Sequence, residues 1–218
     1  MNYFLFPLLV LLILIVNIFL IKKNYLPSSS GDNHQKLTLN NSIPLSGGIY
    51  LILIFFVHFY NQIGLLFFFI LAMFLIGLLS DIKIINSAKL RIILQFIVIF
   101  SLIISFDLKI LSTRIAPFDQ LLETNFINYL FVSFCILIIV NGSNFIDGLN
   151  TLVIGYYSII TIIIYKVNLL SVIPIDSGLV LSWILLLLFI YLLNLINRLF
   201  LGDSGAYFLG FSYAILLI

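Results

Sequence analysis

Long apolar runs, separated by short polar segments, make up almost the whole chain. A helix needs about 20 mostly apolar residues to cross a bilayer, whereas the strands of a membrane barrel alternate apolar and polar residues. The runs do not alternate, so they are expected to be helices. The expected spans are 3–21, 47–60, 63–79, 92–106, 126–140, 149–165 and 178–196, with an eighth run starting near Gly205. The pattern predicts an all-α fold, a polytopic transmembrane helix bundle of about eight helices.

The composition agrees with this pattern. The chain has 218 residues, of which 63% are hydrophobic and 8% are charged, whereas a soluble domain has roughly 25% charged residues. Its one cysteine, Cys135, lies in an apolar run, so a disulfide framework is excluded. Residues 1–20 lack a basic start and a small-residue cleavage site, which favours a retained first span. We predict a single integral membrane domain over residues 1–218 and no nucleic-acid partner.

Lysine and arginine are unevenly divided between the connections. Counted from the N-terminus, the odd connections hold seven of these residues and the even connections hold three. Because cytoplasmic loops are enriched in them, the odd connections are predicted to be cytoplasmic and the N-terminus to lie outside. The predicted cytoplasmic loops are about 22–46, 80–91, 141–150 and 197–204.

Three aspartates, Asp81, Asp147 and Asp203, lie at membrane boundaries in three of these cytoplasmic loops. Each has glycine, serine or asparagine nearby, whereas the outer acidic residues are expected to be solvated. Charged and carboxamide groups at the edge of hydrocarbon are unfavourable unless they bind something. The three clusters are therefore candidates to converge on one site.

The most polar cluster is Asn141-Gly-Ser-Asn-Phe-Ile-Asp-Gly-Leu-Asn150, between two apolar runs. Asn144, Asp147 and Asn150 are spaced by three and share a face if the segment is helical. Such a stripe suits a nucleoside, a sugar or a metal-bound phosphate. The alternative is a helix–helix turn in which Asn144 or Asp147 caps a helix.

Asp203 is flanked by Gly202 and Ser204, and Gly205 follows. Carboxylates and hydroxyls are hard oxygen ligands, and Mg²⁺ usually binds one or two carboxylates plus substrate phosphates. Asp203 is therefore a candidate Mg²⁺ ligand, and the alternative is that it is an N-cap.

The first cytoplasmic loop is basic and ends in glycines. Lys36 is a candidate for neutralising a phosphate, and Gly47-Gly48 would let a backbone or a ligand approach closely. The alternative is a basic juxtamembrane loop followed by a glycine-rich helix start.

Three cations, Lys83, Lys89 and Arg91, follow Asp81 within a few residues. Gln95 lies about one turn beyond Arg91 and is expected to point into the bundle. This group suits an anionic ligand, and the alternative is a positive-inside loop with an internal salt bridge.

These four clusters, in this order, resemble the polyprenyl-phosphate N-acetylhexosamine-1-phosphate transferases (glycosyltransferase family 4). Residues 141–150 look like the family's Asn-x-x-Asn-x-x-Asp-Gly motif, and residues 201–205 look like its Gly-Asp-Thr/Ser-Gly motif. Residues 44–48 look like its Pro-x-x-Gly-Gly motif, and residues 77–95 look like its Asp-Asp segment with the following Lys and Gln. The similarity covers nearly the whole chain.

The resemblance implies the transfer of an N-acetylhexosamine-1-phosphate from a UDP-sugar to undecaprenyl phosphate, which releases UMP. The partners would be undecaprenyl phosphate, a UDP-N-acetylhexosamine and membrane lipid, with a homodimer as an open option. The cofactor would be Mg²⁺, with Mn²⁺ as the alternative ion. The implied place is the cytoplasmic face of a bacterial inner (plasma) membrane, at the first membrane step of cell-envelope glycan synthesis.

The resemblance also implies roles for seven residues. These are catalysis by Asp81, Asp147 and Asp203, metal binding by Asp203 and Asn144, and substrate binding by Lys36, Lys89, Asn144 and Asn150.

The chain departs from the family pattern in two ways. The family usually has adjacent aspartates where this chain has Ser80-Asp81. It also usually has about ten helices and a late, histidine-bearing cytoplasmic loop, so the chain is expected to be truncated at the C-terminus. A phosphate monoester has its second pKa at about 6, so it is mostly dianionic at neutral pH and needs no strong base. Ser80 is therefore expected to be tolerated.

Two other functions remain open: an inactive truncated homologue and an ion-coupled transporter. Transporters bind cations near the bilayer midplane, at broken helices. Here the acids lie at one face and no charged residue lies in the middle of an expected span, which counts against a transporter.

Overall fold

The structure, a computed structural model, describes residues 5–23, 25–26, 43–149, 151–166 and 177–218. Those residues form helices and no strand, which confirms the all-α prediction. The helices are α1 (Leu5–Lys23), α2 (Gly47–Ile63), α3 (Leu66–Asp81), α4 (Ala88–Phe106), α5 (Ala116–Leu122), α6 (Asn125–Ile146), α7 (Leu152–Lys166), α8 (Ser177–Leu195) and α9 (Gly202–Leu216). Eight of them fall on the eight expected runs, and the short helix α5 lies in a stretch expected to be a loop.

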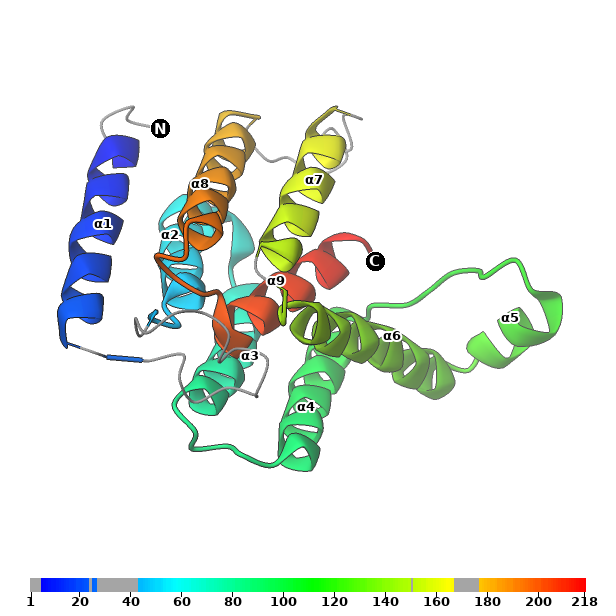
Figure 1. Cartoon of the computed structure of the whole chain (residues 1–218). Helices are drawn as coiled ribbons and strands as arrows, with labels where there is room; N and C mark the ends of the chain where they lie inside the picture. Colours follow the sequence, from blue (N-terminus) through cyan, green and yellow to red (C-terminus); the bar gives the residue numbers. More distant parts are fainter. Residues whose placement is uncertain (1–4, 24, 27–42, 150, 167–176) are drawn as a thin grey trace.

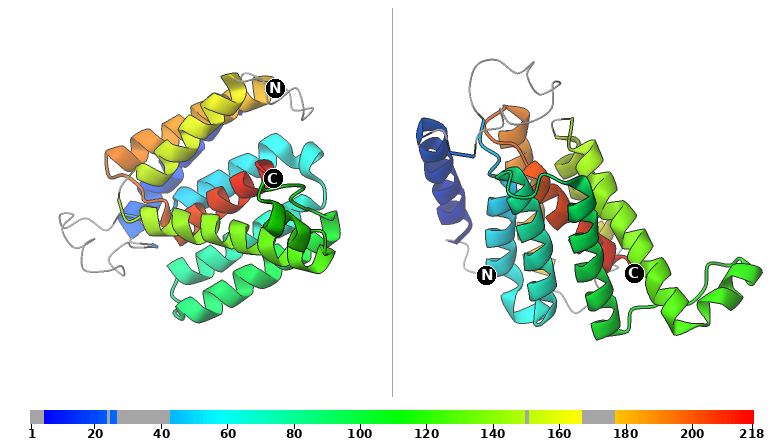
Figure 2. Two further views of the ribbon diagram at one scale, coloured as in Figure 1. Left: turned by 90° about the vertical axis from the view of Figure 1, so that its right-hand side faces the viewer. Right: turned by 90° about the horizontal axis from the view of Figure 1, so that it is seen from below.

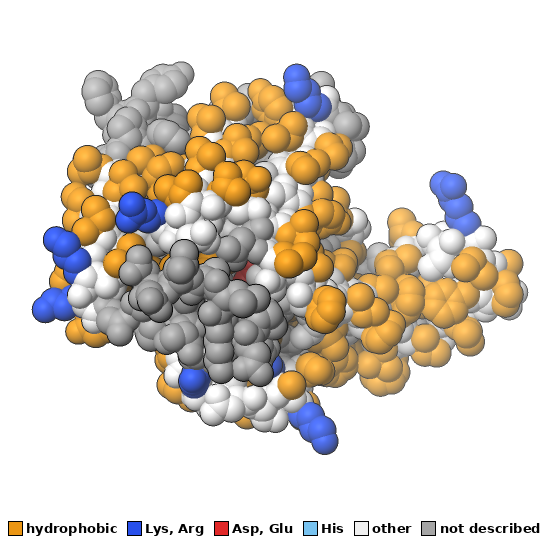
Figure 3. All heavy atoms as spheres, viewed as in Figure 1, with side chains coloured by type: hydrophobic (Ala, Val, Ile, Leu, Met, Phe, Trp, Pro, Cys, Tyr) orange, Lys and Arg blue, Asp and Glu red, His pale blue; other side chains and the backbone are white. Residues whose placement is uncertain are grey.

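Helices α4, α6 and α8 contain segments long and apolar enough to cross a membrane: Ala88–Phe106, Asn125–Ile146 and Gly178–Leu195. Large hydrophobic side chains are also exposed, for example Ile93 on α4 (55% exposed) and Phe134 on α6 (57%). They spread over much of the face shown in Figure 3, while lysine and arginine lie at its edges. An apolar surface of this extent is the surface of a membrane protein.

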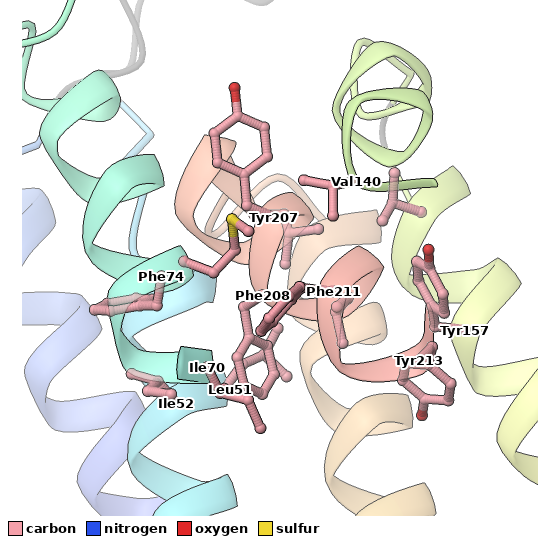
Figure 4. Packing of buried hydrophobic residues seen from close by; sticks show 14 of the residues in the cluster. Leu51, Ile52, Ile70, Phe74, Val140, Tyr157, Tyr207, Phe208, Phe211 and Tyr213 are labelled. Carbon is pink, nitrogen blue, oxygen red and sulfur yellow. The ribbon is translucent and has the colours of Figure 1, made fainter. Parts of the chain in front are cut away.

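Helix α9 lies at the centre of the bundle and packs against α2, α3, α6 and α7 (Figures 1 and 2). It is buried along almost its whole length, as expected for a helix that is apolar on all sides. Phe208 and Phe211 of α9 are fully buried beside Leu51 of α2 and Ile70 of α3 (Figure 4). Tyr207, one residue before Phe208, points its hydroxyl away from this apolar cluster (Figure 4).

Glycines let α2 and α3 touch the backbone of the first turn of α9. A Cβ atom on Gly48 would lie 2.4 Å from the Gly205 nitrogen, and one on Gly77 would lie 2.5 Å from the Ser204 Cα. In addition, the backbone N–H of Gly48 donates to the Leu201 carbonyl (3.0 Å). The glycines at the start of α2 therefore admit a neighbouring backbone, which is one of the two uses expected from the sequence.

Helix α6 is longer than expected and ends at Ile146 instead of residue 140. The polar residues Asn141 and Asn144 ended the apolar run in the sequence, but they continue the helix. Asp147 follows as the C-cap residue, and the turn to α7 comes only afterwards, with Thr151 in a left-handed conformation (φ 70°). Asn144 is therefore not a turn residue.

Candidate active site at the start of helix α9

Three helix ends meet around the first turn of α9 (Figure 1). Asp81 is the last residue of α3, Asp147 directly follows α6, and Asp203 lies in the first turn of α9. The backbone N–H of Asp203 donates to Asp81 Oδ1 (2.8 Å), and the charges of Asp81 and Asp203 both act on Asp147. The structure thus brings together the three aspartates that the sequence placed in separate loops.

Asp81 occupies the N-terminus of α9. Its Oδ1 and Oδ2 accept the backbone N–H groups of Asp203 (2.8 Å) and Ser204 (3.1 Å). These N–H groups have no partner within the helix, and the helix dipole favours an anion there. Gly202 has φ +76°, and a Cβ on it would lie 2.7 Å from Asp81 Oδ2. Glycine is therefore required where the carboxylate approaches.

Asp203 is bound by side chains of α3 and α4. Its Oδ2 accepts a hydrogen bond from Ser80 Oγ (2.6 Å) and forms an ion pair with Arg91 Nη1 (2.6 Å). Arg91 Nη1 also donates to Ser80 Oγ (2.8 Å). The N-cap position of α9 is Leu201 and has no side-chain cap bond, so the alternative of Asp203 as an N-cap is wrong. The sequence left open a salt bridge within the α3–α4 loop. Arg91 does form a salt bridge, but its acidic partner is Asp203 of α9.

Asp147 is affected by burial and by the charges of the two other aspartates. Burial, with the nearby charges of Asp203 and then Asp81, raises the pKa of Asp147 well above its usual range. Arg91 forms the only ion pair with these three acids among the described residues. A raised pKa favours the neutral form of the Asp147 carboxyl group, and a bound cation would favour its ionised form.

Carboxamides on α6 bond to both neighbouring helices. Asn141 Nδ2 donates to Gln95 Oε1 on α4 (2.8 Å), and Asn144 Nδ2 donates to the Tyr207 hydroxyl on α9 (3.4 Å). Gln95 is fully buried, as expected from its position on α4. Because Asn144 donates through Nδ2, the hydrogen bond to Tyr207 does not involve the Oδ1 oxygen of Asn144.

The donor set around Asp203 fits a small divalent cation. Carboxylates of Asp203 and Asp147 and the amide oxygen of Asn144 are the hard oxygen ligands that Mg²⁺ prefers. Ser204 does not belong to this set, because it is fully buried and its Oγ lies against Gly48. The described residues include no group of three or more acidic, histidine or cysteine side chains that would hold a metal. A bound ion would therefore take further ligands from substrate oxygens and water.

The predicted lysines are not part of this arrangement. Lys89 is exposed at the start of α4 and forms no ion pair with any described residue, while Lys36 and Asn150 lie outside the described residues. Arg91 takes the position expected for Lys89, because residues two apart on a helix point in different directions. The spacing of Arg91 and Gln95 by four, which places both on one face, was the available signal.

The family model described as glycosyl transferase family 4 matches residues 63–218, which include Ser80, Arg91 and all three aspartates. Residues 44–48 precede the matched range, so their likeness to the family rests on the motif alone. No curated protein matches the chain. Since the match covers more than half of the sequence, the chain belongs to glycosyl transferase family 4, whose general activity is sugar-phosphate transfer to a polyprenyl phosphate.

Proposed function

We propose that this protein transfers an N-acetylhexosamine-1-phosphate from a UDP-sugar to undecaprenyl phosphate and releases UMP. The observation that carries the proposal is the meeting of Asp81, Asp147 and Asp203 with Arg91 at the ends of membrane helices. A reaction between a membrane lipid and a soluble nucleotide needs a site at the membrane surface, where the ends of spanning helices lie. A transporter site would lie nearer the midplane.

The reaction joins two anionic substrates. A phosphate oxygen of undecaprenyl phosphate attacks the β-phosphorus of the UDP-sugar, and the bond from that phosphorus to the oxygen bridging to the α-phosphorus breaks. The electron pair leaves with UMP, and the sugar remains on the new lipid diphosphate. Because the acceptor is already mostly dianionic at neutral pH, positioning and charge balance supply most of the catalysis.

The residues around α9 divide this work. Asp203, Asp147 and the Asn144 oxygen would hold Mg²⁺, or alternatively Mn²⁺, which supplies charge balance for the diphosphate when bound. Arg91 contributes a fixed positive charge beside Asp203. Asp81 holds the N-terminus of α9 and thereby fixes the position of Asp203. Lys36, Lys89 and Asn150 remain proposed contacts to substrate from the surrounding loops.

The lysine and arginine distribution supports a site on the cytoplasmic face, where a UDP-sugar is available. The family resemblance implies that the membrane is a bacterial plasma membrane. The test uses membranes that contain the protein, undecaprenyl phosphate and a panel of UDP-N-acetylhexosamines. We expect UMP release that requires Mg²⁺ or Mn²⁺ and is lost with EDTA. If no donor in the panel gives UMP, the transferase proposal is wrong.

A further inference from the structure

The Ser80 hydroxyl connects the two charged side chains of the site. It donates to Asp203 Oδ2 (2.6 Å) and accepts from Arg91 Nη1 (2.8 Å). A hydroxyl has one proton and two lone pairs, so it serves both partners at once. Ser80 therefore fixes the position of the Arg91 guanidinium relative to Asp203 without adding charge.

Arg91 has donors that this arrangement does not use. Both of its bonds to Ser80 and Asp203 come from Nη1, although the guanidinium carries five N–H groups. Its Nε is buried and has no acceptor among the described residues. The edge that Nε shares with Nη2 is the planar fork that pairs with two oxygens of a phosphate. A buried donor without a partner, on a guanidinium whose ion pair is with Asp203, indicates an anion that binds beside Arg91.

The identity of residue 80 determines whether this fork stays available. With serine at position 80, the ion pair of Arg91 in the described structure is to one carboxylate, Asp203. An aspartate there would place a second carboxylate beside the guanidinium and would compete with an incoming phosphate for the N–H donors of Arg91. We propose that Ser80 is a positioning residue that holds Arg91 as the anchor for a substrate phosphate. This inference rests on the proposed transferase function.

The experiment measures the binding of UDP and of uridine to the purified full chain with saturating Mg²⁺. For Arg91→Gln we expect UDP affinity to fall about 10-fold to 100-fold, the range for lost hydrogen bonds to a charged group. For Ser80→Ala we expect a fall of about 10-fold, with recovery in Ser80→Thr, which keeps the hydroxyl. Ser80→Asp should also weaken UDP binding. Uridine has no phosphate, so its affinity should not change in any variant.

Arg114→Gln is the matched control, because Arg114 is an exposed arginine of the α4–α6 connection and forms no ion pair with the described residues. It should bind UDP as the unchanged protein does. Melting temperatures measured in parallel separate folding from binding. The inference is overturned if the variants lose affinity for UDP and for uridine alike and also have lower melting temperatures. Ser80 would then have a structural role only.

The substrate phosphate has two sources, and the KM values separate them. Loss of UDP affinity in Arg91→Gln and Ser80→Ala assigns the fork to the nucleotide. A raised KM for undecaprenyl phosphate, with UDP affinity unchanged, assigns it to the lipid. If neither value changes, the inference is wrong while the transferase function stands. If the unchanged protein neither binds UDP nor releases UMP, the failure lies with the proposed function.

Discussion

Two aspartates of the site have the same chemistry and different surroundings. Both oxygens of Asp81 accept backbone N–H groups of α9, whereas Asp203 meets the side chains of Ser80 and Arg91 and is 26% exposed. Asp81 therefore has little capacity left for a ligand, while Asp203 has a second oxygen that makes neither of these bonds. At this scale, hydrogen-bond partners decide which carboxylate supports the fold and which meets substrate.

Exchanging each aspartate for asparagine should separate these roles. In Asp81→Asn, an NH₂ group replaces one of the two oxygens that accept backbone N–H groups of α9. Two donors then face each other, so we expect a loss of about 1–3 kcal/mol in the free energy of unfolding. Its turnover should fall as well, because Asp203 then loses its fixed position. Thermal unfolding and UMP release measure the two effects.

Asp203→Asn should give the opposite balance. We expect its UMP release to fall about 100-fold, as for other charged groups that act on a transition state. Its stability should fall by about 1 kcal/mol or less, because a partly exposed ion pair contributes little. Wild-type turnover in Asp81→Asn, or in Asp203→Asn, would contradict the role assigned to that residue.

At the scale of elements, the site depends on how closely the N-terminus of α9 approaches α2 and α3. Gly48 and Gly77 leave no space for a side chain against residues 204–205. Helices without a hydrophobic driving force in lipid associate through such small residues and through polar contacts. The same contacts that hold the bundle together therefore set the position of Asp203 relative to Ser80 and Arg91.

Gly77→Val should displace α9. Its Cβ would lie 2.5 Å from the Ser204 Cα and 2.6 Å from the Asp203 carbonyl oxygen, and backbone atoms cannot rotate away. We expect a loss of about 1–3 kcal/mol in stability, typical of overpacking, together with loss of UMP release.

Gly142→Ala is the control for this change. Gly142 lies in α6 close to the site, and a Cβ there meets nothing within 4 Å. Alanine in a helix interior should leave activity intact and raise stability by about 0.5–1 kcal/mol. Equal effects of the two substitutions on the melting temperature would refute the role of close packing at Gly77.

At the scale of the whole molecule, the helix ends that carry Asp81, Asp147 and Asp203 come together, and large hydrophobic side chains are exposed on the long apolar helices. The connection between α4 and α6 leads away from the site and carries α5, at the far right of Figure 1. If the site is cytoplasmic, this connection must lie on the outer side.

Cysteine labelling in cells tests that orientation. In a Cys135→Ser background, Lys83→Cys should react with a membrane-impermeant maleimide only after the cells are opened. Leu111→Cys, at a position that is 96% exposed in the α4–α6 connection, should react in intact cells. The reverse pattern would place the site outside and contradict the orientation expected from the lysine and arginine distribution.

The sequence by itself determined the fold class, the positions of the eight apolar helices and the acidic residues, because apolar length and polar interruptions are local properties. It also indicated, through Gly47-Gly48, where a backbone or a ligand approaches closely. The extra residues of α6 escaped it, since a helix continues through asparagines when its polar side chains find partners such as Gln95 and Tyr207.

Only the tertiary structure decided which charged groups meet. Arg91, and not Lys89, contacts Asp203, because the direction of each side chain depends on how α4 packs within the bundle. In the same way, Asp81 and not Asp203 accepts the backbone N–H groups at the N-terminus of α9, because α3 ends beside that turn. Contacts between residues more than one hundred positions apart are set by the packing of helices, which no local pattern in the sequence specifies.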